Sequence, residues 1–267
     1  MSDERADPAR HVPEGPVPSS EDGRWLLDLV KVMARLRAPG GCPWDREQTH
    51  ETLARHLLEE AHELLEAIDG GNADAIRDEL GDLLLQVVFH AQIASDEGRW
   101  DVDDVARGLV EKLVHRHPHV FGDVEVSGAE EVLTNWEKLK AEETGARRDV
   151  DDEIPATLPA LARAAKVQRR AAGWGATWSG AAEVVELLRE DVDALAGEGS
   201  AGAEDRVGEL LFAVVAASRA LGVDAESALR RATRGFADRF ERLMGEDPER
   251  SLSDEEMRSL VRAPARD

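Results

Sequence analysis

The stretch that decides the fold reads Glu79-Leu-Gly-Asp-Leu-Leu-Leu-Gln-Val-Val-Phe89. At about 100° per residue, its apolar side chains cover nearly the whole circumference of a helix. Only a narrow polar strip remains, and it contains Glu79, Asp82 and Gln86. A helix that is apolar almost all round is normally a buried helix. We therefore predict that this helix is buried.

Carboxylates in so apolar a helix are costly unless a cation or hydrogen-bond donors compensate them. The preceding helix carries a second acidic group, Leu58-Glu-Glu-Ala-His-Glu63, and a Gly70-Gly-Asn72 turn separates the two helices. The turn predicts an antiparallel hairpin. Four carboxylates can converge in such a hairpin: those of Glu60, Glu63, Glu79 and Asp82. Oxygen ligands of this kind suit Mg²⁺ or Mn²⁺.

Each acidic group also has a simpler interpretation. A helix face rich in glutamates is usually just solvated, which is the alternative for the first group. For Glu79 and Asp82, the alternative is pairing with an Arg or Lys side chain. Both alternatives stay open on spacing alone.

The rest of the chain continues the helical pattern, without the persistent alternation that is typical of strands. Aromatic residues make up only 4% of the 267 residues and Tyr is absent, so packing relies on Leu, Val and Ala. That composition favours helices over sheets. We predict an all-α fold with helices over residues 24–36, 49–68, 73–95, 102–115, 129–143, 158–172, 181–196, 203–221 and 224–244.

The second half of the chain repeats the first. Arg206-Val-Gly-Glu-Leu-Leu-Phe-Ala-Val-Val-Ala216 keeps the apolar frame of the 79–89 stretch. Arg206 takes the place of Glu79, and Glu209 takes the place of Asp82. In the partner segment, Ala194 stands where Glu63 stands in the first half. The chain thus contains one intact acidic hairpin and one degenerate hairpin.

These patterns predict five consecutive parts. Residues 1–22, rich in Pro, Ser and charges, form a disordered N-terminal segment. A catalytic module over 23–143 is followed by a linker over 144–158. A degenerate module over 159–245 precedes a C-terminal tail over 246–267.

Net charge restricts the partners. The chain has 33 basic and 56 acidic residues, which gives a net charge of −23. So acidic a protein is poorly suited to bind a nucleic-acid backbone or an anionic membrane.

A single cysteine, Cys42, excludes an intrachain disulfide, and no stretch approaches the roughly 20 apolar residues of a membrane span. We expect a cytoplasmic protein with no nucleic-acid or membrane partner.

Two further motifs suggest other sites at first sight. The Gly40-Gly-Cys-Pro-Trp-Asp45 loop lacks the Gly-Lys-Ser/Thr ending of a phosphate-binding P-loop, so we expect it to fix the first helix against the second, with Trp44 buried. The histidines at 115, 117 and 119 have no nearby cysteine, which argues against a zinc site. A loop that closes the site is the preferred interpretation for them.

Together, five segments resemble the MazG-type nucleoside triphosphate pyrophosphohydrolases of the all-α NTP pyrophosphatase superfamily. They occur in the family's order and are Gly41–His50, Leu58–Glu63, Glu79–Leu85, Arg116–Phe121 and Asn135–Glu143. The resemblance covers residues 24–245, including the duplication. It implies two tandem MazG-like helical modules built on antiparallel helix hairpins.

The resemblance implies Mg²⁺-dependent hydrolysis of nucleoside triphosphates to the monophosphate and pyrophosphate, a nucleotide-pool house-cleaning activity. It implies Glu60, Glu63, Glu79 and Asp82 as metal ligands, with Mn²⁺ as a possible substitute. Glu59 would orient or deprotonate the attacking water. The expected substrate-binding residues are Lys112, Arg116 and Trp136.

Two other functions stay open: a narrow-specificity pyrophosphatase, such as one acting on dUTP, and a non-catalytic helical regulator that senses nucleotides. The intact acids of the first module argue against the regulator. In the second module, Gly235 aligns with Lys112 and no Trp matches Trp136, so we assign activity to the first module only. Helical hairpins with apolar residues on both faces also predict a homodimer or a higher homo-oligomer.

Overall fold

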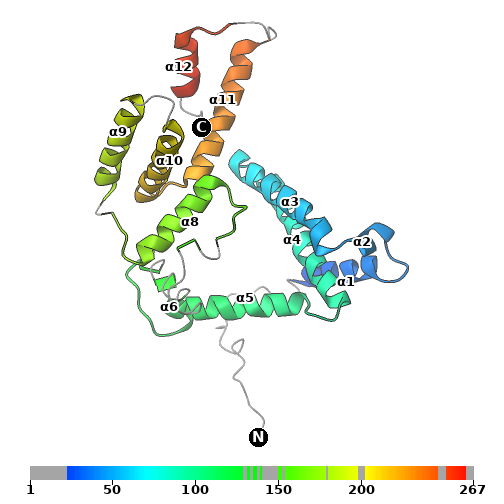
Figure 1. Ribbon diagram of the computed structural model, residues 1–267. Helices are drawn as coiled ribbons and strands as arrows, with labels where there is room; N and C mark the ends of the chain where they lie inside the picture. The colour runs from blue at the N-terminus through cyan, green and yellow to red at the C-terminus, as the bar shows by residue number, and fades with distance from the viewer. Residues whose placement is uncertain are drawn as a thin grey trace. The chain divides into compact units, whose positions relative to one another are not determined.

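The computed structural model describes residues 23–128, 131–132, 135–136, 139, 150–151, 154–178, 180–197, 202–245 and 251–262. Over these residues every regular element is a helix and no strand occurs (Figure 1). The all-α prediction is therefore confirmed. The chain divides into two compact units, residues 1–136 and 137–267, which we call the first and second units.

The first unit is built around one helix hairpin. Its helices are α1 (Arg24–Arg37), α2 (Pro43–Glu47), α3 (His50–Gly70), α4 (Ala73–Asp96), α5 (Val102–Arg116) and α6 (Pro118–Phe121). Gly71, with φ of 68°, ends α3 in the left-handed conformation that glycine adopts without strain. The side chain of Asn72 then accepts hydrogen bonds from the first turn of α4. This short turn makes α3 and α4 neighbours along most of their length (Figure 1).

The core of the first unit lies toward the C-terminal half of α4. Its fully buried apolar side chains are Met33, Leu53, Val88, Phe89 and Ile93. Another face of α4 is different, because Leu80, Leu84 and Val87 keep 50%, 40% and 41% of their surface exposed. Within the described residues of the first unit, the prediction that this helix is buried all round is therefore wrong. The helices of the first unit cover only one side of α4.

One arginine ties the loop after α1 to the end of α4. The Arg37 side chain is only 8% exposed, and its Nε lies 2.7 Å from a carboxylate oxygen of Asp96. Its guanidinium also donates to the backbone carbonyls of Asp45 and Gln48 on either side of the end of α2. We call this group of contacts the Arg37 brace.

The tight turn before α2 requires glycine. A Cβ atom on Gly41 would lie 2.1 Å from the backbone oxygen of Leu36, which no side chain can occupy. The next residue, Cys42, donates its N–H to the same oxygen at 2.8 Å. Trp44 follows, packed edge-on against Phe89 but half exposed, so its predicted burial is also wrong. Arg37, the last residue of α1, links this loop to α4 through Asp96.

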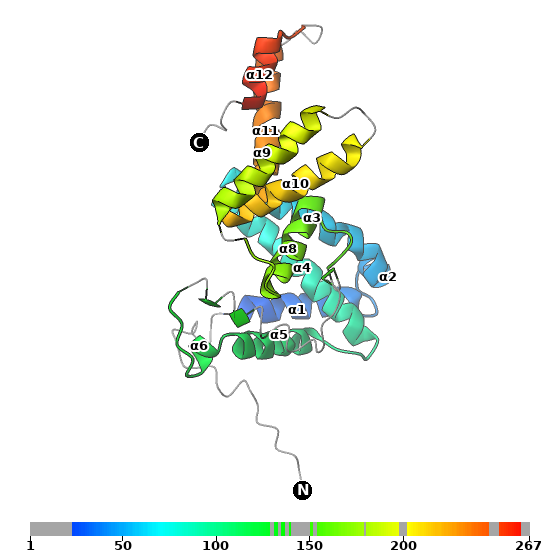
Figure 2. The same ribbon diagram turned by 60° about the vertical axis from the view of Figure 1, so that its left-hand side comes forward.

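The second unit contains α8 (Ala160–Gly173), α9 (Ala181–Gly197), α10 (Ala203–Ala220), α11 (Ala225–Met244) and α12 (Asp254–Arg262). α9 packs on α10 as α3 packs on α4, and α12 lies beside α11 (Figure 2). The sequence pattern did not predict α12. The predicted helix over 129–143 falls mostly outside the described residues. Among the described helices, none has both the length and the apolar composition to cross a membrane.

Candidate metal centre

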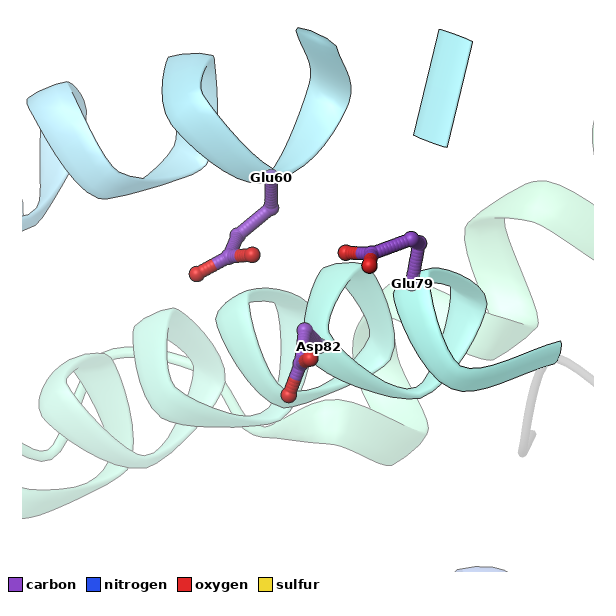
Figure 3. Close-up of side chains that lie close together, drawn as sticks. All are labelled: Glu60, Glu79 and Asp82. Atoms are coloured by element: carbon purple, nitrogen blue, oxygen red, sulfur yellow. The ribbon is translucent and has the colours of Figure 1, made fainter. Parts of the chain in front are cut away.

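Three carboxylates meet between α3 and α4. Glu60 comes from the middle of α3, and Glu79 and Asp82 lie one turn apart near the start of α4 (Figure 3). One oxygen of each side chain lies within 4.8 Å of the other two. We call Glu60, Glu79 and Asp82 the acid cluster.

The acid cluster is electrostatically unfavourable by itself. Partial burial raises the pKa of Glu60, and the negative charges of Asp82, Glu63 and Glu79 raise it further. Partial burial likewise raises the pKa of Glu79, with added repulsion from Glu63 and Asp82. Both effects disfavour the charged form of these carboxyl groups. A cation that binds to the acid cluster would therefore stabilise their charged form.

No basic side chain supplies that cation within the described part of the chain. Neither an ion pair nor a hydrogen bond links Glu60, Glu79 or Asp82 to any Lys, Arg or His there, so the ion-pair alternative finds no support among the described residues. The donor set consists of carboxylate oxygens alone. Such a set fits Mg²⁺ or Mn²⁺ and offers nothing to a metal that prefers sulfur or nitrogen.

The other two predicted acids lie beside the acid cluster. Glu63 follows Glu60 by one turn on α3 and acts on the cluster through its charge, as the pKa of both Glu60 and Glu79 shows. Its oxygens are not among those that meet within 4.8 Å. Glu59 instead pairs with His56, whose Nδ1 lies 3.0 Å from the Glu59 carboxylate.

The predicted substrate-binding residues gather at the end of α5. The Arg116 guanidinium carbon lies 5.2 Å from the centre of the Trp136 ring, within the range of a cation–π contact. Lys112 lies one turn before Arg116 on α5 and is exposed. Among the described residues, no hydrogen bond or ion pair links Lys112 to the acid cluster. The structure thus brings Arg116 and Trp136 together, while Lys112 is exposed and makes no such contact with the acid cluster among the described residues.

In the second unit, an ion pair occupies the position of the acid cluster. Arg206 Nη1 lies 2.9 Å from a carboxylate oxygen of Glu209 on α10. These residues correspond to Glu79 and Asp82 on α4. Within the described residues of the second unit, no three metal-ligating side chains come as close together as those of the acid cluster.

Sequence reasoning missed a polar contact at the far end of the α3–α4 hairpin. His50 at the start of α3 and His90 near the end of α4 face each other with their Nδ1 atoms 2.7 Å apart. The two residues are 40 positions apart in the sequence, and no local pattern links them. Only the antiparallel register of the hairpin could have indicated that they meet.

Comparisons with known proteins agree with this architecture. The model of the MazG nucleotide pyrophosphohydrolase domain matches residues 48–121, from the residue before the α3 N-cap to the end of α6. The chain is 45% identical over 225 residues to the nucleoside triphosphate pyrophosphohydrolase/pyrophosphatase MazG of Thermotoga maritima, covering 84% of this chain and 87% of that protein.

Two further relatives have similar names. The nucleoside triphosphate pyrophosphohydrolase of Escherichia coli K12 is 45% identical over 221 residues, covering 79% of this chain and 84% of that protein. The nucleoside triphosphate pyrophosphohydrolase of Mycobacterium tuberculosis is 48% identical over 156 residues, covering 58% and 47%. The similarity to the first two extends over both units.

Proposed function

Because the chain belongs to the MazG family of nucleotide pyrophosphohydrolases, we propose that its first unit hydrolyses nucleoside triphosphates to the monophosphate and pyrophosphate in a reaction that requires Mg²⁺. The chain is a nucleoside triphosphate pyrophosphohydrolase by family. The assignment to the first unit and the choice of metal are our proposals. Both proposals rest on the acid cluster, whose three carboxylates have no basic partner in the described part of the chain.

In this proposal, Glu60, Glu79 and Asp82 hold the metal, and Glu63 is the fourth acid of the set. A divalent cation supplies neutralisation of the charge that develops on the phosphoryl oxygens. The oxygen of water adds to the α-phosphorus while the bond from that phosphorus to the bridging oxygen breaks. Pyrophosphate then leaves with the bridging oxygen.

The proton of the attacking water needs an acceptor. We assign this role to Glu59, whose exposed carboxylate already accepts a hydrogen bond from His56 when that ring carries the proton on Nδ1. Lys112 and Arg116 are assigned to the phosphates, because guanidinium and ammonium groups complement phosphate charge. Trp136 is assigned to the nucleobase, with which an indole ring can stack.

The test is a panel of nucleoside triphosphates assayed with Mg²⁺, with Mn²⁺ and after exhaustive chelation. Pyrophosphate as the first product and loss of turnover without metal are expected. Reaction in ¹⁸O-labelled water should place the label in the monophosphate, since the proposal has water attack the α-phosphorus. Orthophosphate as the first product, label in pyrophosphate, or undiminished turnover after chelation would overturn it. The same panel measures how narrow the base preference is.

We also propose that a second copy of the chain covers the exposed side of α4. The exposed apolar residues Leu80, Leu84 and Val87 form a stripe along this helix. The corresponding residues of α10, Val207, Leu211 and Val214, form the same stripe with 42%, 46% and 38% exposure. Two stripes of aliphatic side chains at matching positions indicate a packing surface, because an exposed apolar patch of this kind usually marks an interaction site.

Sedimentation of the wild-type chain should therefore give a homodimer or a higher homo-oligomer. A charge in the stripe, as in Leu84→Glu, should shift the chain toward the monomer. Val124→Glu, which changes an exposed valine in the turn after α6, is the matched control and should leave the assembly unchanged. A wild-type chain that sediments as a monomer at all concentrations would contradict this proposal.

A further inference from the structure

The contact between His50 and His90 has a defined protonation pattern. Arg99 Nη2 lies 3.0 Å from His50 Nε2, and an arginine can only donate. His50 Nε2 therefore accepts, which leaves the proton of the neutral ring on Nδ1. That N–H donates across 2.7 Å to Nδ1 of His90. His90 must then carry its own proton on Nε2.

Among the residues that the structure describes, none offers an acceptor to the Nε2–H of His90. This nitrogen is buried, and no group of the described chain bonds to it. Burial lowers the pKa of His90, and the neighbouring His50 lowers it further. Neither burial nor the neighbouring His50 therefore favours a positive charge on the ring.

The charged groups around the pair do not change this conclusion. From the turn after α4, the Arg99 guanidinium meets His50 directly and pairs with Glu97. From α3, Glu51 accepts a hydrogen bond from Thr49, and its carboxylate also interacts with the charges of His50 and Arg99, which help to lower its pKa. Among the described residues, His90 is not one of the groups that act on Glu51. Trp100 lies against His50 with a ring-centre distance of 6.2 Å and an angle of 25°. Beside the end of α4, Arg37 of α1 is already paired with Asp96.

From this geometry we propose that His50 and His90 form an acid-sensitive latch between the start of α3 and the end of α4. While both rings are neutral, one N–H···N bond joins the two helices. When the Nδ1 of His90 also gains a proton, it can no longer accept, and two N–H groups face each other at hydrogen-bond distance, near the positive charge of Arg99. The bond is lost, repulsion replaces it, and the start of α3 separates from α4.

The latch is independent of the proposed metal site, but its opening has a consequence for that site. Glu60 is on α3, while Glu79 and Asp82 are on α4, so the geometry of the acid cluster depends on how these two helices lie together. The latch fixes the opposite end of the same helix pair. Opening it in acid should loosen the acid cluster as well, and this second step rests on the proposed function.

The direct test is nitrogen NMR of the metal-free full chain with ¹⁵N-labelled histidine, followed from neutral to acidic pH. Of the eight histidines, His50 should carry its proton on Nδ1, the less common form, and His90 on Nε2. His90 should stay neutral below the ordinary histidine pKa of about 6.5. Single replacements of each histidine assign the signals. The proposed latch would be ruled out if both rings carried their proton on Nε2. It would also be ruled out if His90 titrated at or above the ordinary histidine pKa of about 6.5.

A second measurement tests the consequence for stability. The free-energy difference between folded and unfolded states should fall as the pH drops below about 6.5, because the unfolded chain binds the proton that folded His90 resists. The double variant His50→Phe/His90→Phe keeps an aromatic ring at each position, but neither ring can bind a proton. Its melting temperature should therefore fall less than that of the wild type between neutral and acidic pH. His62→Asn, an exposed histidine on α3, should retain the wild-type fall. Equal falls in the wild type and the double variant would contradict the latch, whatever the metal assays show.

Discussion

Arg206 and Glu209 pair at 2.9 Å on α10, at the positions that Glu79 and Asp82 occupy on α4. The guanidinium thus supplies from within the chain the positive charge that the acid cluster lacks. An arginine at this position also repels a divalent cation, so the two hairpins have the same framework but opposite electrostatics.

All turnover should therefore come from the first unit. Glu79→Ala leaves the second unit as the only other possible source of activity and should lower Mg²⁺-dependent turnover by more than about 100-fold, beyond the loss typical of residues that merely orient a metal ligand. Steady-state pyrophosphate release measures it. Activity within about tenfold of the parent, a barrier change of only roughly 1.4 kcal/mol, would contradict the assignment.

The complementary variant is Glu209→Ala. It removes the partner of Arg206 but touches no residue of the proposed active site, so the rate per active site should stay nearly unchanged. A large loss of turnover in this variant would show that the second unit takes part in the reaction.

Repulsion within the acid cluster should make it a source of instability in the metal-free protein. Glu79→Gln removes one charge and keeps the shape, so the melting temperature in a chelator should rise. With saturating Mg²⁺ the order should reverse, because only the wild type gains the full binding energy. Glu66→Gln, on an exposed part of α3, is the control and should change neither value appreciably. A lower metal-free melting temperature for Glu79→Gln would mean that this carboxylate has a structural partner.

Metal binding should release protons in mild acid. The pKa of Glu60 and of Glu79 is raised above the ordinary glutamate value, so these groups favour the folded state at low pH and lose that contribution as the pH rises through their folded-state pKa. A cation must displace any proton still bound. Calorimetry of Mg²⁺ binding in buffers of different ionisation enthalpy should show proton release at about pH 5 and almost none at about pH 8. Equal release at both values would contradict the raised pKa.

The Arg37 brace should contribute more to stability than any exposed ion pair of the first unit. Arg37→Ala removes a buried guanidinium from one carboxylate and two carbonyls, and should lower the free energy of unfolding by about 1.5–3 kcal/mol. Arg77→Ala removes an arginine that pairs with Asp74 and Asp78 while exposed, and should cost less than about 1 kcal/mol. Urea unfolding of both variants measures the difference, and equal losses would refute it.

Helical periodicity was sufficient to predict most of the fold. The expected helices over 24–36 and 73–95 end one residue short of α1 and α4, because apolar spacing and the caps at Gly71 and Asn72 are local features. The short helix α12 was missed, since it follows the region in which the two halves of the chain resemble each other. Burial was harder to predict, as Leu80, Leu84 and Val87 show. An apolar pattern indicates which side chains are unfavourable in water but does not identify the surface that covers them. That surface can belong to a second copy of the chain.

For the candidate site, sequence spacing predicted which acids can share a hairpin but not where each carboxylate points. Glu60, Glu79 and Asp82 meet because the antiparallel register brings the middle of α3 opposite the start of α4. Glu59, adjacent to Glu60 in sequence, is drawn to His56 one turn earlier on the same helix. Arg37 and His50 were not recognised, since their partners lie 59 and 40 residues away and only the folded chain brings them together.

The Arg37 brace also has a consequence for the order in which the first unit folds. The α3–α4 hairpin is closed by a turn of two residues, so its contacts are close in sequence and can form early. The bond from Arg37 to Asp96 spans 59 residues and requires α1, the α2 loop and the end of α4 to be in place first. Interactions that form after the transition state slow unfolding and leave the folding rate almost unaltered. The brace is therefore a kinetic lock: losing Arg37 should shorten the lifetime of the folded unit, while a refolding chain should reach the native state as fast as before.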